Sequence, residues 1–246
     1  MSGLPERAAE LLAGFRAVDL RTLEAGAELN VRTDRKHLLG WADAERLLEA
    51  LVPSHAALEI GDRRAFEYDT AYFDTSDLQC FRAHVQGRRR RFKCRTRLYA
   101  DTDACALEVK LRGSRDLTVK LRRPVAARRH GRLDADGHAF LGACLGPLPP
   151  LAPALRGRHT RVTLVAGAER CTLDLDLAYA GGGALAPGIV IAETKSARGR
   201  GAADRALLAL GSRPVACSKY CLGIALQGRG AAPLELRPLV RRCAAA

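Results

Sequence analysis

The stretch GRRRRFKCRTRLY, residues 87–99, constrains the fold more than any other part of the sequence. Cations recur at every second position from Arg91 to Arg97, and mostly apolar side chains lie between them. Successive side chains of a β-strand point to opposite faces of a sheet, so this alternation predicts a strand with one cationic and one mostly apolar face. The cationic face then has to contact water, nucleic acid or a smaller anion.

The same alternation recurs in other segments. A single antiparallel strand with one charged face usually exposes that face to solvent, so no segment is decisive alone. Here Arg and Lys dominate face after face, and the apolar faces need helices to cover them. We therefore expect an inverted barrel with charges lining an interior channel. The charged positions that share a face are Glu108, Lys110 and Arg112; Lys120 and Arg122; Arg170, Asp174 and Asp176; and Glu193 and Lys195.

The candidate inner faces carry far more cations than carboxylates. Burying so many charges is costly unless they are paired, and internal pairing does not neutralise this surplus. Phosphates are the natural source of the missing negative charge, because Arg offers bidentate forks and Lys a compact point charge. The carboxylates could also hold Mg²⁺ or Mn²⁺ that bridges phosphate oxygens. The cations are Lys36, Arg91, Lys93, Arg95, Arg97, Lys110, Arg112, Lys120, Arg122, Arg158, Arg170, Lys195 and Lys219, and the carboxylates are Asp34, Glu108, Asp174, Asp176 and Glu193.

Composition narrows the function classes. The chain has 246 residues, 48% of them hydrophobic, and a net charge of +13, which indicates a globular protein with a polyanionic partner. Only 5% of residues are aromatic and they do not interleave with the basic strand as stacking platforms, so nucleic acid is the weakest choice. The eight cysteines form no CxxC pair and the histidines no HExxH motif, which favours free buried thiols over a zinc site.

The sequence shows no pattern typical of a signal peptide or a transmembrane helix. The N-terminal stretch has charges where a signal peptide needs an apolar run, and no run of about 18 apolar residues predicts a transmembrane helix. We expect a cytoplasmic protein of one α+β domain. Its predicted helices cover residues 4–18, 41–51, 134–145, 201–211 and 218–226, and its predicted strands 28–39, 66–75, 87–99, 104–113, 115–124, 158–167, 169–179 and 189–196.

These strands carry a recognisable series of motifs. In order along the chain they are VRTDRKHLL, YFDTSDL, TRLYADTDACALEVKLRG, LTVKLRRP, CTLDLDLAY, IVIAETKS and SKYC. Together they resemble the polyphosphate polymerase domain, also called the VTC domain, of the CYTH or triphosphate tunnel metalloenzyme superfamily. The likeness spans residues 28–226. It divides the chain into an N-terminal helical segment (1–27), the tunnel domain (28–226) and a C-terminal tail (227–246).

The resemblance implies an eight-stranded antiparallel β tunnel with a charged interior and helices packed outside. Enzymes of this family transfer the γ-phosphate of ATP onto a growing polyphosphate chain with Mn²⁺ or Mg²⁺. By motif, the implied metal ligand is Glu193, and the implied catalytic residues are Lys36, Arg95, Arg97, Lys110, Lys120, Arg158, Arg170 and Lys219. Lys93, Arg112, Arg122, Arg161 and Lys195 are the implied substrate-binding residues. Arg158 lies in RGRHTR rather than the family's usual pattern, so its role could instead belong to Arg161.

Two other functions stay open at this point. A triphosphatase or other phosphohydrolase would use the same metal and cationic walls. A sensor of polyphosphate or inositol phosphates would also use a basic tunnel, but it would lack Glu193. Glu108, Asp174 and Asp176 are either further metal ligands or salt-bridge partners. The sequence identifies neither the metal, nor the product length, nor a membrane partner.

Overall fold

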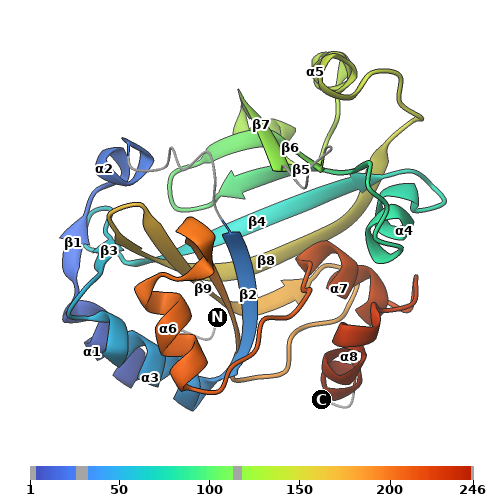
Figure 1. The fold of residues 1–246 in the computed structure, drawn as a ribbon. Helices are drawn as coiled ribbons and strands as arrows, with labels where there is room; N and C mark the ends of the chain where they lie inside the picture. The colour runs from blue at the N-terminus through green and yellow to red at the C-terminus, as the bar shows by residue number, and fades with distance from the viewer. Residues whose placement is uncertain (1–3, 26–32, 113–117, 245–246) are drawn as a thin grey trace. The chain divides into compact units, whose positions relative to one another are not determined.

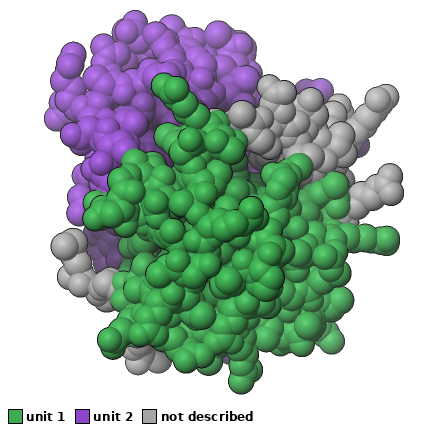
Figure 2. Space-filling model, turned by 90° about the vertical axis from the view of Figure 1, so that its left-hand side faces the viewer, with its two compact units in different colours: residues 1–66, 160–176, 185–217 green, residues 67–159, 177–184, 218–246 purple. Residues whose placement is uncertain are grey.

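The computed structural model describes residues 4–25, 33–112 and 118–244. They belong to two compact units (Figure 2). Unit 1 comprises residues 1–66, 160–176 and 185–217, and unit 2 comprises residues 67–159, 177–184 and 218–246.

Antiparallel strands dominate the fold (Figure 1). Eight strands follow one another through hydrogen bonding in the order β2-β10-β9-β8-β4-β5-β6-β7, and the short β3 pairs with β1 and β8 outside this path. The strands are β1 (Arg16–Val18), β2 (Thr33–Gly40), β3 (Ala56–Leu58), β4 (Ala65–Asp74), β5 (Arg91–Tyr99), β6 (Ala104–Arg112), β7 (Thr118–Val125), β8 (Ala152–Ala166), β9 (Glu169–Tyr179) and β10 (Ile189–Ser196). The predicted α+β fold with eight antiparallel strands is confirmed.

Helices lie before, between and after the strands along the chain. They are α1 (Glu6–Ala13), α2 (Leu20–Ala25), α3 (Trp41–Leu51), α4 (Gln79–Val85), α5 (Ala135–Leu145), α6 (Ala202–Ala209), α7 (Lys219–Leu226) and α8 (Arg237–Ala244). Short 3-10 turns cover Ala127–Arg129, Ala197–Gly199 and Leu234–Leu236.

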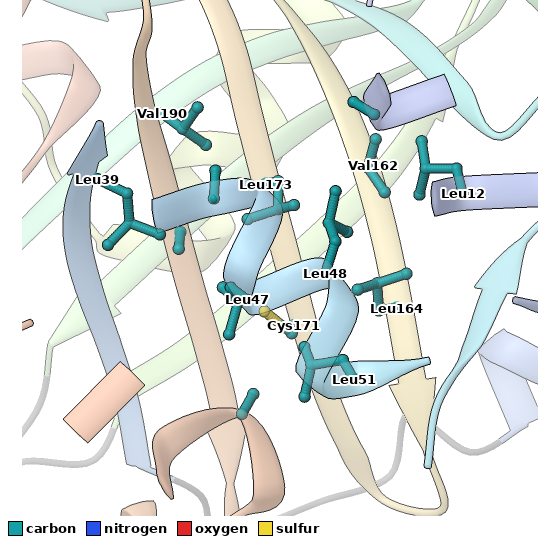
Figure 3. Packing of buried hydrophobic residues seen from close by; sticks show 14 of the residues in the cluster. Leu12, Leu39, Leu47, Leu48, Leu51, Val162, Leu164, Cys171, Leu173 and Val190 are labelled. Carbon is teal, nitrogen blue, oxygen red and sulfur yellow. The ribbon is translucent and has the colours of Figure 1, made fainter. Parts of the chain in front are cut away.

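In unit 1 the apolar face of the sheet is covered by α3. Its buried residues Ala44, Leu47, Leu48 and Leu51 recur at helical spacing and so form one apolar stripe. Figure 3 shows this stripe packed over sheet residues such as Leu173. Helices α1 and α6 extend the same cluster. The charged side chains of these strands therefore point to the opposite face.

In unit 2 the apolar face of β4, β5 and β6 is covered by α5. Leu141 of α5 is buried against Phe73, Cys94, Leu107 and Val109. Helix α5 begins where the Asp134 carboxylate accepts a hydrogen bond from the Gly137 backbone N–H at 2.9 Å. The arrangement leaves the cationic face of these strands on the other side.

The predicted elements differ from the structure mainly at their ends. The helix predicted over residues 4–18 stops at Ala13, and residues 16–18 form β1 instead. Strand β8 begins six residues earlier than predicted, within the stretch assigned to a connection. The short β3 and helices α2 and α8 were not predicted. The turn expected after Arg112 falls in residues 113–117, outside the described residues. The predicted division at residues 27 and 226 stays a prediction.

Candidate functional site

The cationic face of unit 2 is built by β5, β6 and β7. The register pairs Lys93 with Lys110, and Lys110 with Lys120, so three lysines lie side by side across three strands. One step further along the strands, Glu108 lies between Arg95 and Arg122. Neighbouring strands are only about 4.8 Å apart, so these side chains share one small surface.

Glu108 is the centre of an ion-pair cluster on this face. Its side chain is 2% exposed, and its two oxygens contact Arg95 at 2.7 Å and Lys120 at 2.5 Å. Burial alone would raise the pKa of Glu108, but Arg95 and the nearby cations hold it well below its usual range. Burial also lowers the pKa of Lys120, to about 8, against the opposing effect of Glu108. Glu108 is thus a counter-ion that fixes two predicted site residues.

Other predicted residues of this face are held by aromatic neighbours. The Arg97 guanidinium lies 5.3 Å from the ring centroid of Tyr68 and is 6% exposed, and Arg122 lies 5.2 Å from that of Tyr99. Such cation–π contacts orient a guanidinium without consuming all of its donors. Arg112 shares the face at the end of β6, opposite Arg91.

The start of helix α7 meets the same face. Lys93 Nζ donates to Ser218 Oγ at 2.8 Å and lies 3.2 Å from His84 Nε2 of α4. Ser218 is also the N-cap residue of α7, and the next residue is the predicted Lys219. The structure thereby brings Lys219 to the end of α7 that contacts the cationic face. His84 and Ser218 were missed from the sequence, although Ser218 is part of the SKYC motif.

The cationic face of unit 1 lies on β2, β10 and β9. Glu193 pairs in register with Lys36 on one side and Thr172 on the other, and Lys195 pairs with Arg170. The Lys195 ammonium contacts the Glu193 carboxylate directly. Burial alone would raise the pKa of Glu193, but Lys195 and Lys36 keep it well below its usual range. Glu193 therefore stays ionised among cations.

Arg161 completes this face. Its Nε and Nη2 donate to the two Asp174 oxygens at 2.6 and 2.8 Å, a bidentate pair with a fully buried carboxylate. Asp174 is thus held by a salt bridge. The next acidic residue of β9, Asp176, is exposed and has a φ of 51°, which interrupts the alternation of the strand. Neither aspartate joins Glu193 in a carboxylate cluster.

Arg158 occupies a different face from the one predicted. Its Nε donates to Asp69 Oδ2 at 2.7 Å, and Asp69 pairs in register with Leu98, on the apolar side of β5. Arg156 and His130 bind the same carboxylate. Because side chains alternate along β8, an even-numbered residue there points away from the cationic face. Of the two arginines that the sequence offers for this role, Arg161 lies on the cationic face and Arg158 does not.

The carboxylates suit a metal that is held mainly by its substrate. Within the described ranges, no group of three or more His, Cys, Asp or Glu side chains is arranged to hold a metal ion. Mg²⁺ commonly uses one or two carboxylates and takes its other ligands from phosphate oxygens and water. An ionised Glu193 beside cationic, phosphate-attracting side chains fits that donor set.

Comparison with solved structures shows the fold. HpAC1 from Hippeastrum, assigned as an adenylyl cyclase and described as having a dominant triphosphatase activity, is 16% identical over 83% of this chain and all of its own, with a TM-score of 0.54. A protein from Bacillus halodurans assigned as an adenylate cyclase is 14% identical over 87% of this chain and 97% of its own, with a TM-score of 0.48. The first likeness confirms the predicted fold.

The family comparison agrees with the motifs. Residues 31–133, which hold β2 to β7, match the model of the VTC domain. The resemblance to the VTC domain is therefore confirmed over this stretch. No curated protein matches the chain. Among the residues that the structure describes, no helix combines the length and the apolar character needed to cross a membrane.

Proposed function

We propose that this protein is a polyphosphate polymerase that transfers the γ-phosphate of ATP onto a polyphosphate chain. One observation carries the proposal. The sequence contains only six lysines, and the remaining cations of its 40 Lys and Arg are arginines. Five of the six lie on the two cationic faces and the sixth is the first residue of α7. They are Lys36, Lys93, Lys110, Lys120, Lys195 and Lys219.

The placement of the lysines has a physical explanation. Arginine provides most of the cations of this chain and most of the ion pairs among the described residues, so we read lysine as used where a compact, strongly hydrated ammonium is needed. Three of the lysines lie side by side at one level of the sheet, where like charges directly opposite each other are destabilising. A bound phosphate chain removes that repulsion. Glu108, the carboxylate two residues along β6, pairs with Arg95 and Lys120.

The protein's task in phosphoryl transfer is to position the reactants and neutralise spreading charge. In the proposal, Lys93, Lys110 and Lys120 contact the phosphate chain in unit 2. Glu108 holds Arg95 with its remaining donors directed to phosphate oxygens. In unit 1, Lys36 and Arg161 bind further phosphates. The attacking phosphate oxygen is already anionic, so no general base is assigned.

Glu193 is the residue that would hold a divalent cation. When bound with nucleotide, Mn²⁺ or Mg²⁺ would neutralise phosphate charge during transfer. Lys36 and Lys195 would keep Glu193 ionised and orient it from either side. The proposal keeps residues 28–226 as the catalytic region and a cytoplasmic location, where ATP is available.

A triphosphatase is the second candidate. One solved structure that shares this fold, HpAC1, is described as having a dominant triphosphatase activity. A hydrolase positions a water as the attacking group, whereas a polymerase positions a phosphate. The row of lysines beyond Glu108 favours an extended phosphate chain and hence the polymerase.

Incubation of the purified protein with ATP and Mn²⁺ tests the proposal. We expect a ladder of polyphosphate on a gel, and its loss in Glu193→Gln with polyphosphate binding retained. Glu59→Gln, an acidic residue in a partly exposed ion pair with Arg64, is the matched control and should retain the ladder. Free phosphate without a ladder would replace the polymerase with the triphosphatase. Polyphosphate binding without either product would replace both with a sensor.

A further inference from the structure

Unit 1 contains a cavity of about 460 Å³ at the end of its cationic face. It lies between β1, the helix α2, β3, the β8–β9 turn and the last residues of β10. Its volume falls within the 300–1,000 Å³ typical of pockets for small ligands.

The walls of the cavity have two chemical characters. One part is apolar and is built from Val18, Leu23 and Val165 with the small side chains of Ala56 and Ala166. The other part is polar. Thr22, Ser54, Glu169 and three cations provide hydrogen-bonding groups there, the cations being Arg16, Arg170 and Lys195.

The cavity is continuous with the candidate site. Lys195 and Arg170 line it and also belong to the cationic face, where they are paired in register. Lys195 in turn contacts Glu193, two residues or about 7 Å further along β10. Arg170 Nη2 donates to the carbonyl oxygen of Leu23 at 3.1 Å, which fixes the apolar wall to the cationic strand.

Glu169, one of the residues that line the cavity, is held by two backbone hydrogen bonds. Its two carboxylate oxygens accept the backbone N–H groups of Ala202 and Ala203 at 2.7 Å each, at the start of α6. The polar wall is therefore built before a ligand arrives. Binding to a pre-formed pocket is stronger because less free energy is lost in ordering side chains.

We infer that this cavity seats the nucleoside portion of the nucleoside triphosphate. The inference rests on the proposed function and adds to it the place of the sugar and base. An inorganic polyphosphate chain is anionic along its whole length and gains nothing from Val18, Leu23 and Val165. A nucleoside triphosphate has an organic end for the apolar wall and phosphates for Lys195 and Arg170. The hydroxyls of Thr22 and Ser54 offer partners for the sugar or the base.

Filling the cavity tests the inference. Ala166→Trp places an indole against the apolar wall, and Ala168→Trp does the same from an exposed turn residue, which keeps the fold at less risk. Calorimetric titrations with ATP and with inorganic tripolyphosphate then separate the two ends of the ligand. We expect ATP binding to weaken at least tenfold in both variants, while tripolyphosphate binding stays within twofold of the wild type. Leu208→Trp, on an exposed position of α6, should change neither.

The outcomes distinguish this inference from the proposed function. Unchanged ATP binding in both variants would overturn the nucleoside pocket and leave phosphate transfer standing. Equal losses for ATP and tripolyphosphate in a folded Ala168→Trp protein would also overturn it, because the cavity would then belong to the phosphate site. Wild-type protein that binds neither compound would overturn both.

Discussion

Lys93 and Lys110 lie directly opposite each other in the register of β5 and β6, and Lys120 follows at the same level on β7. Like charges directly opposite each other on one face repel, and a bound anion would reduce that repulsion. The strand alternation that puts them on one face also puts Val109 and Leu107 in the core on the other. The fold thus places the proposed anion site on the face opposite the core.

Replacing Lys110 by alanine should separate stability from function. Removing one of the opposed charges should raise the free energy of unfolding by up to about 1 kcal/mol in the absence of phosphate. The same change should weaken tripolyphosphate binding at least tenfold. Urea unfolding with and without tripolyphosphate measures both. Arg128→Ala, at an exposed position of the same unit, should alter neither quantity. A Lys110→Ala protein that is both less stable and fully competent in binding would contradict the reading of this row.

We expect that arginine cannot take over the role of lysine in this row. Lys110→Arg keeps the charge but substitutes a planar fork for a compact ammonium next to two other cations. We expect polymerase kcat to fall at least fivefold with the protein still folded. Arg128→Lys is the reciprocal control and should retain wild-type kcat. Full activity of Lys110→Arg would show that charge alone is sufficient and would weaken the argument from lysine distribution.

Arg158 and Arg161 should behave oppositely. Arg161 lies beside Glu193 and should be needed for activity, whereas Arg158 binds Asp69 on the other face and should not. We expect Arg161→Lys to lower kcat/KM at least tenfold and Arg158→Lys to leave it within twofold. The two variants have the same chemistry and differ only in face. The reverse ranking would restore the assignment of Arg158.

The pH dependence of phosphate binding should report Lys120. Its pKa is lowered to about 8 by burial, so the free protein loses this charge as the pH rises through 8. An anion prefers the charged form, and binding of tripolyphosphate should therefore weaken between pH 7 and pH 9. Lys120→Arg stays charged over this range and should flatten the profile. An equally steep decline in Lys120→Arg would assign the titration to another group.

Acid should destabilise unit 2 partly through Asp69. Burial alone would raise the pKa of this carboxyl, but hydrogen bonds from His130 and Arg156 hold it below its usual range. A carboxyl with a lowered folded pKa stabilises the protein above its unfolded pKa of about 4 and loses that contribution as the pH falls further. Asp69→Asn should cost about 1–3 kcal/mol of unfolding free energy at pH 7 and less at pH 3, because the unfolded carboxyl takes up a proton at a higher pH than the folded one. An equal cost at both pH values in urea unfolding would contradict this.

Alternation and helical spacing were enough to predict much of the fold. The helix Trp41–Leu51 was predicted with its observed ends because Ala44, Leu47, Leu48 and Leu51 form a regular stripe. The cationic row of β5 followed from alternation in the same way. Residues 152–157 were harder, because prolines and glycines hide a strand that is defined by pairing with distant residues. The two-residue alternation of β9 is interrupted at Asp176, whose φ is 51°, and the sequence pattern does not predict this interruption.

The candidate site was predicted in its residue types more than in its contacts. Arg158 and Arg161 occupy even and odd positions of β8 and therefore point to opposite faces of the sheet. The sequence alone did not show which of these faces is the cationic one, because it did not place β8 in register with its neighbours. His84 and Ser218 reach Lys93 only because α4 and α7 pack at the same end of β5. Such contacts depend on tertiary packing, which local patterns do not contain.

The most direct test is the affinity of tripolyphosphate for a protein in which Lys93, Lys110 and Lys120 are all replaced by glutamine. Glutamine keeps much of the length of each side chain and removes the charge. We predict that calorimetry will show at least a hundredfold loss of affinity relative to the wild type, with the variant still folded. An affinity within threefold of the wild type would contradict the claim that these lysines hold the phosphates.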